Sequence, residues 1–201
     1  MQRDYNYEYE YEYDSRYCYH SSKVLKNKLN ITDADELAEA ERKITFLRTV
    51  EASQKGISGR FDFTHLKKIH KFLFFDIYEW AGKIRVVNIS KGNQFCRVEF
   101  IDDQMREIFE KLRKENYLKG IDNKQQLAKR LAYYLGEINA IHPFREGNGR
   151  CQRLFIQLLS ESLGYKLDFM KISEDEMLEA SVKSFDLDYV MLEELIYKAM
   201  S

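Results

Sequence analysis

Hydrophobic residues recur every three or four positions along most of the chain, with polar residues between them. This is the period of a helix that buries one face. The clearest case covers residues 123–141, where Leu127, Leu131, Leu135 and Ile138 share a face. The same spacing predicts further helices at residues 33–52, from 64 onward, from 102 or 103 onward, from a glycine-rich turn to Gly164, from Ser173 onward, and at 188–199.

Polar residues indicate where several of these helices begin. Asp33 and Ser173 are good N-cap residues, and each is followed three positions later by a glutamate, as in a capping box. In the helix at 33–52, the face expected to be buried consists of Leu37, Ala40, Ile44 and Leu47.

Two stretches depart from the helical period. Between residues 85 and 100, β-branched residues flank Lys91-Gly92-Asn93, which predicts a β-hairpin. Residues 5–14 alternate tyrosine with mostly acidic residues, but no apolar segment lies beside them to complete a sheet. We therefore expect residues 1–18 to form an extended or disordered arm, with an edge strand that pairs with a partner as the alternative.

Composition supports one mainly helical domain. The 201 residues suffice for one domain, and a single proline and nine glycines leave few chain breakers. The prediction is an all-α domain over residues 19–201 with one small β-hairpin.

Charge and cysteine content narrow the setting of the protein. A net charge of −1 provides no general attraction to nucleic acid or to a membrane surface, and no stretch is long and apolar enough to span a bilayer. The three cysteines have no metal-binding spacing, and an odd number suits reduced thiols. With no signal peptide at the first residues, we expect a cytoplasmic protein without nucleic-acid or membrane partners.

Candidate chemistry is concentrated in residues 142–153, between two predicted helices. Gly147 and Gly149 allow the backbone to turn tightly and to approach a ligand. The helix that follows begins with unpaired N–H groups, which favour an anion such as phosphate. Arg150 and Arg153 lie three positions apart on one face of this helix, so both can bind the same polyphosphate.

Two further residues of the segment suit phosphate transfer. Glu146 supplies a carboxylate next to the anion site, as is usual for Mg²⁺ held between protein and phosphates. His142 titrates near neutrality and can take a proton from an attacking hydroxyl. Each residue taken singly also suits a cap, a core position or a solvated face, but their joint occurrence favours a phosphate-transfer site. No Walker lysine follows the glycines.

Residues 142–153 resemble the HxFx(D/E)GNGRxxR signature of the Fic (Fic/Doc) family at every defined position. The resemblance extends over about residues 19–199, with residues 24–29 similar to the opening segment, 69–82 similar to a second landmark and 85–100 similar to the flap hairpin. It implies a Fic-type helical domain that transfers AMP from Mg-ATP to a Ser, Thr or Tyr hydroxyl of a target protein and releases pyrophosphate.

The resemblance also implies a role for each residue of the signature. His142 is the base, and Glu146 holds Mg²⁺. The residues expected at the ATP and its loop are Phe144, Gly147, Asn148, Gly149, Arg150 and Arg153. The flap is expected to dock the target by backbone pairing, through Asn88, Ile89, Ser90, Lys91, Gly92, Asn93, Gln94 and Phe95. For Phe95, ordinary packing of the hairpin is the alternative, and His70 is expected to be structural.

Family members are often restrained by a helix with the pattern (S/T)xxxE(G/N), and this chain has no complete match. Thr32 to Glu36 comes closest, but Leu37 follows where glycine or asparagine is expected. The resemblance therefore implies the subgroup in which a separate antitoxin protein supplies that helix, with Glu36 as the weaker alternative within the chain. Alternative functions are phosphoryl, UMP or phosphocholine transfer, removal of AMP, or nucleotide binding without catalysis.

Overall fold

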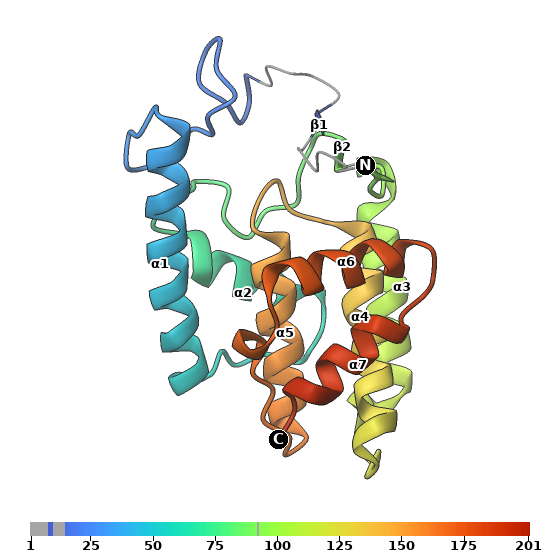
Figure 1. The fold of residues 1–201 in the computed structure, drawn as a ribbon. Coiled ribbons are helices and arrows are strands. Elements are labelled where there is room, and N and C mark those ends of the chain that lie inside the picture. The colour runs from blue at the N-terminus through green and yellow to red at the C-terminus, as the bar shows by residue number, and fades with distance from the viewer. Residues whose placement is uncertain (1–7, 10–14, 92) are drawn as a thin grey trace.

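The computed structural model describes residues 8–9, 15–91 and 93–201. Within them, helices α1 to α7 surround a buried core, and a small sheet lies at one end (Figure 1). The helices are α1 Ala34–Lys55, α2 Phe63–Phe74, α3 Ile101–Lys114, α4 Lys124–Ile141, α5 Asn148–Ser162, α6 Glu174–Phe185 and α7 Val190–Ala199. The strands are β1 Glu8–Tyr9, β2 Ile89–Lys91 and β3 Asn93–Gln94, and three short 3-10 turns occupy Val98–Phe100, Asn116–Leu118 and Phe169–Lys171.

Polar caps begin the helices where the sequence predicts them. Asp33 accepts a hydrogen bond from the N–H of Glu36, and Asn123 accepts one from the N–H of Gln126. Ser173 and its partner three residues later form a complete capping box at the start of α6. Each cap satisfies an N–H group that has no partner inside its helix.

Helix α4 lies at the centre of the helical layer. It packs against α3, α5, α6 and α7, and the four residues of its predicted face, Leu127, Leu131, Leu135 and Ile138, are all buried. Helix α5 runs back beside α4, so that the short connection between them lies at the end of the domain where β1 and β2 are found (Figure 1).

The predicted face of α1 is wrong in part. Leu47 is 66 % exposed, whereas Glu41 and Thr45 are buried. The buried face of α1 therefore contains Leu37, Glu41 and Thr45, which follow one another at intervals of four positions. Two of these three side chains are polar. Glu41 and Thr45 can be buried because both have hydrogen-bonding partners inside the domain, and the buried face of α1 is shifted accordingly.

The predicted hairpin is present as β2 and β3, which pair in antiparallel register with Ser90 opposite Gln94. The other edge of β2 pairs with β1, with Glu8 opposite Ser90 and Tyr9 opposite Ile89. The alternation predicted for residues 5–14 otherwise lies outside the described residues. Further along, Tyr17 and Cys18 are already buried in the core of the domain.

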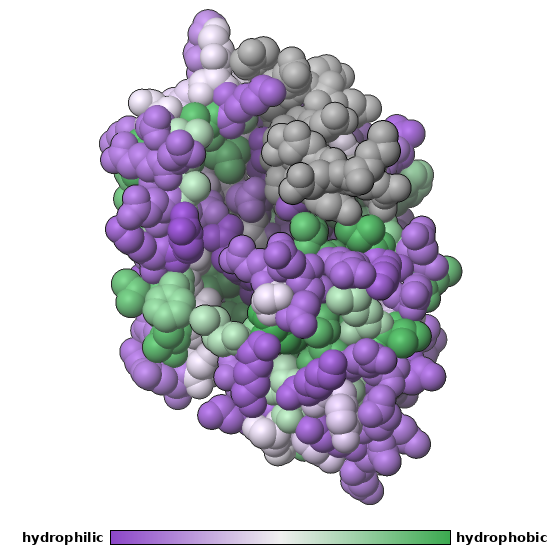
Figure 2. Space-filling model, viewed as in Figure 1, coloured by the Kyte–Doolittle hydropathy of each residue, from purple (hydrophilic) through white to green (hydrophobic). Residues whose placement is uncertain are grey.

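Figure 2 shows one face of the molecule, on which hydrophilic residues cover most of the surface and hydrophobic ones gather in a band across the middle. Within the described part of the chain, no helix is both long enough and apolar enough to cross a bilayer.

Candidate active site

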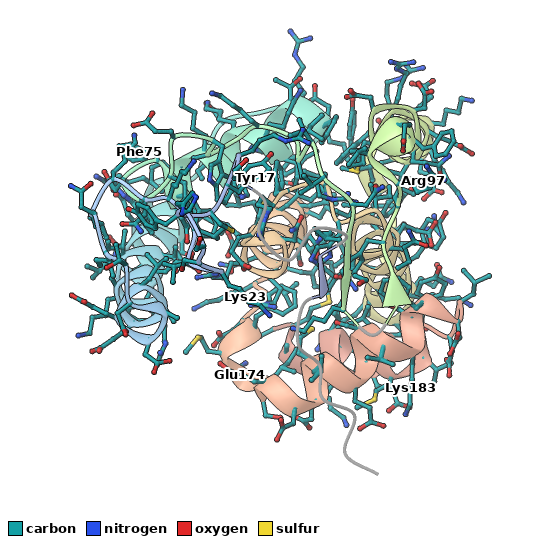
Figure 3. The ribbon with its side chains drawn as sticks, turned by 90° about the horizontal axis from the view of Figure 1, so that it is seen from above. Tyr17, Lys23, Phe75, Arg97, Glu174 and Lys183 are labelled. Atoms are coloured by element: carbon teal, nitrogen blue, oxygen red, sulfur yellow. The ribbon has the colours of Figure 1, made fainter. Side chains whose placement is uncertain are left out.

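The segment of residues 142–153 connects α4 to α5 and continues into the first turns of α5. Figure 3 looks down onto this end of the molecule, with Tyr17 on one side of the end of α5 and Glu174, the first residue of α6, on the other. The residues before α1 and the start of α6 therefore lie on two sides of this end of α5.

His142 closes α4 and carries a ring that is held from two sides. Its backbone is left-handed, with φ 51°, and its N–H donates to the carbonyl of Ile138 at 3.0 Å. Nδ1 lies 3.1 Å from the carbonyl oxygen of Asn139, and the ring stacks on Phe95 with centroids 3.8 Å apart. Because a carbonyl can only accept, the proton sits on Nδ1 and the basic nitrogen is Nε2.

The surroundings of His142 keep the imidazole neutral. The residue is only 5 % exposed, and burial lowers its pKa to about 3. A buried charged form loses hydration, so the neutral form dominates at pH 7. The side chain is thus in the protonation state that a general base needs.

Two sets of contacts fix the loop itself. The amide of Asn148 accepts from the N–H of Phe144 and donates to the carbonyl of the same residue, both at 2.8 Å. The ring of Phe144 is buried and stacks on His70 at 3.9 Å. Asn148 therefore uses its side chain to hold the loop closed, which leaves the backbone N–H groups at the start of α5 as donors for an anion.

His70 attaches the loop to the segment after α2. The N–H of Gly82 donates to Nδ1 at 2.8 Å, so Nε2 carries the proton and donates to the carbonyl of Glu146 at 2.9 Å. Burial lowers the pKa of His70 to about 3, which preserves this neutral form. The contacts agree with the structural role expected for this residue.

Gly147 occupies a position that no other residue fits. Its φ is +79°, and a Cβ there would lie 2.1 Å from the ring of Phe74. Residues with a Cβ rarely adopt this backbone conformation, and a Cβ atom cannot lie so close to an aromatic carbon. The turn brings the chain into α5, whose first residues have no side-chain cap. The N–H groups of this helix end are therefore available for an anion.

Arg150 is held by polar residues of α1, which is distant from it in the sequence. Its guanidinium forms an ion pair with Glu41 of α1, donates to the hydroxyl of Thr45 at 3.2 Å and lies 4.9 Å from the centre of the Phe74 ring. The other oxygen of Glu41 accepts from the hydroxyl of Tyr78 at 2.5 Å. Buried polar groups on α1 therefore orient the first arginine of the signature.

Arg153 differs from Arg150 in its partners. Within the described part of the chain, no hydrogen bond or ion pair holds its side chain, and burial together with the charge of Arg150 lowers its pKa. Glu174 at the start of α6 contributes attraction at longer range. Glu36, the weaker candidate for inhibition, is exposed in the first turn of α1, and no contact between Glu36 and Arg153 is found among these residues.

Glu146 is placed to hold one side of a metal ion. One oxygen accepts from the N–H of Gly147 at 2.8 Å and lies 3.5 Å from the guanidinium of Arg150. Burial, with the nearby charge of Glu41, raises the pKa of this carboxyl group. Among the described residues no cluster of three or more metal-binding side chains occurs. A single carboxylate beside a phosphate site fits Mg²⁺, which takes its other ligands from phosphates and water.

The flap is only partly open to a target. Phe95 is buried and its ring stacks on that of His142, so it contributes no exposed side chain to this surface. Asn88 accepts from the N–H of Val98 at 3.0 Å and closes the base of the hairpin. Strand β2 lies within the segment expected to receive a target, and one of its edges is already paired with β1. Gly92 lies outside the described residues.

Sequence reasoning assigned no site role to Glu41 or Arg85. Glu41 could have been noticed because Leu37, Glu41 and Thr45 keep the spacing of one helix face. Arg85 gave no such signal, because two of its carbonyl partners, Ile141 and His142, are more than 50 positions away in the sequence.

One end of the helical domain brings together a helix N-terminus, two arginines, a carboxylate and a neutral histidine, an arrangement that suits phosphate transfer. The chain belongs to the Fic/DOC family, whose model matches residues 60–160. It is 40 % identical to the probable protein adenylyltransferase y4lH of Sinorhizobium fredii, over 87 % of this chain and 90 % of that protein.

A second relative is considerably longer than this chain. The chain is 43 % identical to the protein adenylyltransferase VbhT of Bartonella schoenbuchensis over 163 residues, which are 81 % of this chain and 34 % of VbhT. The chain thus spans about a third of that relative. It is also 33 % identical to the probable protein adenylyltransferase Fic of Escherichia coli, over 92 % of both proteins.

Known structures confirm the fold. The BepC protein of Bartonella tribocorum with bound AMPPNP superposes with a TM-score of 0.86 at 26 % identity, covering 92 % of this chain and 96 % of that one. The N-terminal Fic domain of a Bartonella quintana effector with bound ADP gives the same TM-score at 28 % identity, covering 92 % and 94 %. Both structures contain an adenine nucleotide.

Proposed function

We propose that this protein is a protein adenylyltransferase, which transfers AMP from Mg-ATP to a hydroxyl group of another protein. The observation that carries the proposal is the arrangement of residues 142–153, in which a neutral histidine stands beside an open helix N-terminus with two arginines. The names of the relatives and the adenine nucleotides in the similar structures support the same activity.

The residues of the loop suit each step of this reaction. The triphosphate binds at the N-terminus of α5, with Arg150 and Arg153 on its outer phosphates. His142 takes the proton of the target hydroxyl at Nε2, and the hydroxyl oxygen forms a bond to the α-phosphorus. The bond between the α-phosphorus and the bridging oxygen breaks, and pyrophosphate leaves with that oxygen. The negative charge of the bound triphosphate raises the pKa of His142 and strengthens it as a base.

Glu146 is the residue that would hold Mg²⁺ at this site. When bound, the ion neutralises charge on the phosphates and helps to orient them. The backbone N–H groups of α5 supply the protein's own stabilisation of the negative oxygens around the reacting phosphorus. The side chains of Asn148 and His70 hold the loop and so fix the positions of these N–H groups before a nucleotide binds.

Replacement of His142 tests the proposal directly. We expect His142→Ala to reduce AMP transfer by about 10²- to 10⁴-fold, the usual loss for a general base, while ATP affinity changes by less than about twofold. Transfer is measured with ATP labelled at the α-phosphate, and ATP affinity by calorimetry. The control is His20→Ala, at an exposed histidine outside the site.

The outcomes of this experiment separate the alternatives. Label arriving only from ATP labelled at the γ-phosphate would identify phosphoryl transfer and overturn the proposal. An equal loss of ATP binding and transfer in His142→Ala would show a structural histidine. UTP or a phosphocholine donor preferred over ATP, or removal of AMP from a modified protein, would place the chain among the other transferases of this fold.

We further propose that a separate small protein restrains the activity by supplying a glutamate to Arg153. The support is that Arg153 has no ion-pair partner within the described residues, and that the sequence has no complete inhibitory motif. The protein substrate would dock on the flap, by pairing with the backbone of residues 88–95.

A further inference from the structure

Arg85 is the largest of the fully buried side chains, with 1 % of its surface exposed. Its guanidinium lies between the flap and the end of α4. The side-chain hydrogen bonds end on four backbone carbonyls, those of His142 (2.8 Å), Val87 (2.8 Å), Ile141 (3.3 Å) and Cys96. No carboxylate pairs with Arg85 in the described part of the chain.

The four carbonyls belong to two parts of the site. Ile141 and His142 end α4 and carry the base, whereas Val87 and Cys96 lie just before and just after the hairpin of β2 and β3. The N–H of Arg85 also donates to the carbonyl of Pro143 at 2.9 Å. Arg85 thus connects both ends of the flap to His142, together with the N–H of Cys96, which donates to the carbonyl of Ala140 at 3.2 Å, and the stacking of Phe95 on His142.

Because Arg85 is charged, its hydrogen bonds depend strongly on where the four carbonyl groups lie. Burial lowers its pKa to about 10, so the guanidinium is still charged at pH 7. A buried cation without a carboxylate depends on carbonyl dipoles that point at it. The planar guanidinium directs its donors along fixed lines, and a shift of the flap relative to His142 would break some of these bonds.

We propose that Arg85 is a positioning residue that sets the place of the flap relative to His142, and thereby the distance between a docked hydroxyl and the base. This inference rests on the proposed function for its catalytic meaning. The loop between α4 and α5 is held in place separately, by hydrogen bonds from the amide of Asn148 and the ring of His70. Arg85 therefore acts on the alignment of the acceptor and leaves nucleotide binding intact.

The experiment compares Arg85→Met and Arg85→Lys with wild type. Methionine fills part of the volume without donors, and lysine keeps the charge with fewer fixed donors. We expect Arg85→Met to lower kcat for AMP transfer more than tenfold and to raise KM for the protein target, with Arg85→Lys between it and wild type. ATP affinity should stay within about twofold of wild type in both variants.

The matched control is Arg97→Met, at a mostly exposed arginine that follows the docking residues 88–95 and pairs with Glu99. This control should keep the wild-type kcat. Amide hydrogen exchange of residues 87–96, measured on the same proteins, should be faster in Arg85→Met only. This readout needs no catalysis, so it tests the link between Arg85 and the flap even if wild type transfers no AMP.

Two results would overturn the inference. One is a folded Arg85→Met protein with wild-type kcat and unchanged exchange in the flap. The other is a parallel loss of ATP affinity and transfer, which would show that Arg85 builds the nucleotide site. If Arg85→Met fails to fold, Arg85→Lys decides between the same outcomes. Absence of AMP transfer in wild type would instead contradict the proposed function.

Discussion

At the scale of single residues, the two histidines of the site give the protein a characteristic response to acid. His70 and His142 both have a pKa of about 3 in the folded protein because they are buried. In the unfolded chain each titrates near its ordinary value of about 6.5. Between these values the unfolded state binds more protons, so the free energy of unfolding decreases as the pH falls.

We therefore predict a loss of stability between pH 6.5 and 5, on the order of 2 kcal/mol for each histidine at pH 5. Urea unfolding at several pH values measures it. His142→Gln should reduce the dependence on pH by roughly one proton, because glutamine does not titrate. Stability curves of wild type and His142→Gln with the same dependence on pH would contradict this account.

The residues of the signature show what the sequence reveals at this scale. The spacing of His142, Gly147 and Arg150 predicted a loop that opens a helix, and the structure places them there. Glu41 was missed, because its ion pair with Arg150 joins residues 109 positions apart, and the spacing of Glu41 along α1 does not identify that partner. The roles assigned by resemblance to the signature residues stay predictions until variants are measured.

At the scale of elements, strand β1 is the unexpected feature. It pairs with β2, one of the two strands of the flap on which the proposed function places a protein target. Two strands cannot occupy the same edge of β2, because each backbone N–H and carbonyl there serves one neighbour. A target that docks by pairing with β2 must therefore displace Glu8 and Tyr9.

We predict that removal of this pairing increases the rate of target modification. The variant Glu8→Pro/Tyr9→Pro removes two N–H donors and disfavours the strand, whereas Glu8→Thr/Tyr9→Val keeps a chain that favours strand formation. The proline variant should show a lower KM for the target, by several-fold, and the same ATP affinity, as measured with labelled ATP. A proline variant with unchanged or higher KM would show that targets do not use this edge.

Helix α1 shows why the faces of some elements could not be predicted. Its spacing correctly predicted a helix, but the choice of buried face assumed that the apolar residues would lie inside. Leu47 is exposed and Glu41 is buried, because Arg150 and Tyr78 supply partners for the carboxylate. In α4, where every buried position is apolar or glycine, the predicted face is confirmed.

At the scale of the whole molecule, the all-α fold with a small hairpin is confirmed, as is membership of the Fic family. The fold was predictable because most helices have a clear apolar period and polar caps. The division into an arm over residues 1–18 and a domain over 19–201 stays a prediction. Tyr17 and Cys18, from the end of that arm, are buried in the core.

Regulation also belongs to this scale, since the proposed restraint comes from outside the chain. We predict that the purified protein is active on its own and that Glu36→Gly leaves the rate of AMP transfer unchanged, because Glu36 is exposed and does not contact Arg153. The rate of AMP transfer by Glu36→Gly is compared with that of Glu174→Gln, which removes the charge of a carboxylate that attracts Arg153 at longer range. An inert wild type that Glu36→Gly activates would place the inhibitor within the chain.

The pairing of β1 with β2 has a consequence for which proteins can be modified. Because the arm is tethered to the same chain, it competes at an effective concentration that can reach the millimolar range, however dilute the enzyme is. A target with only a short, weakly pairing segment would seldom win this competition, whereas one held by additional contacts elsewhere would. The arm would thus act as a threshold that selects targets by their total affinity.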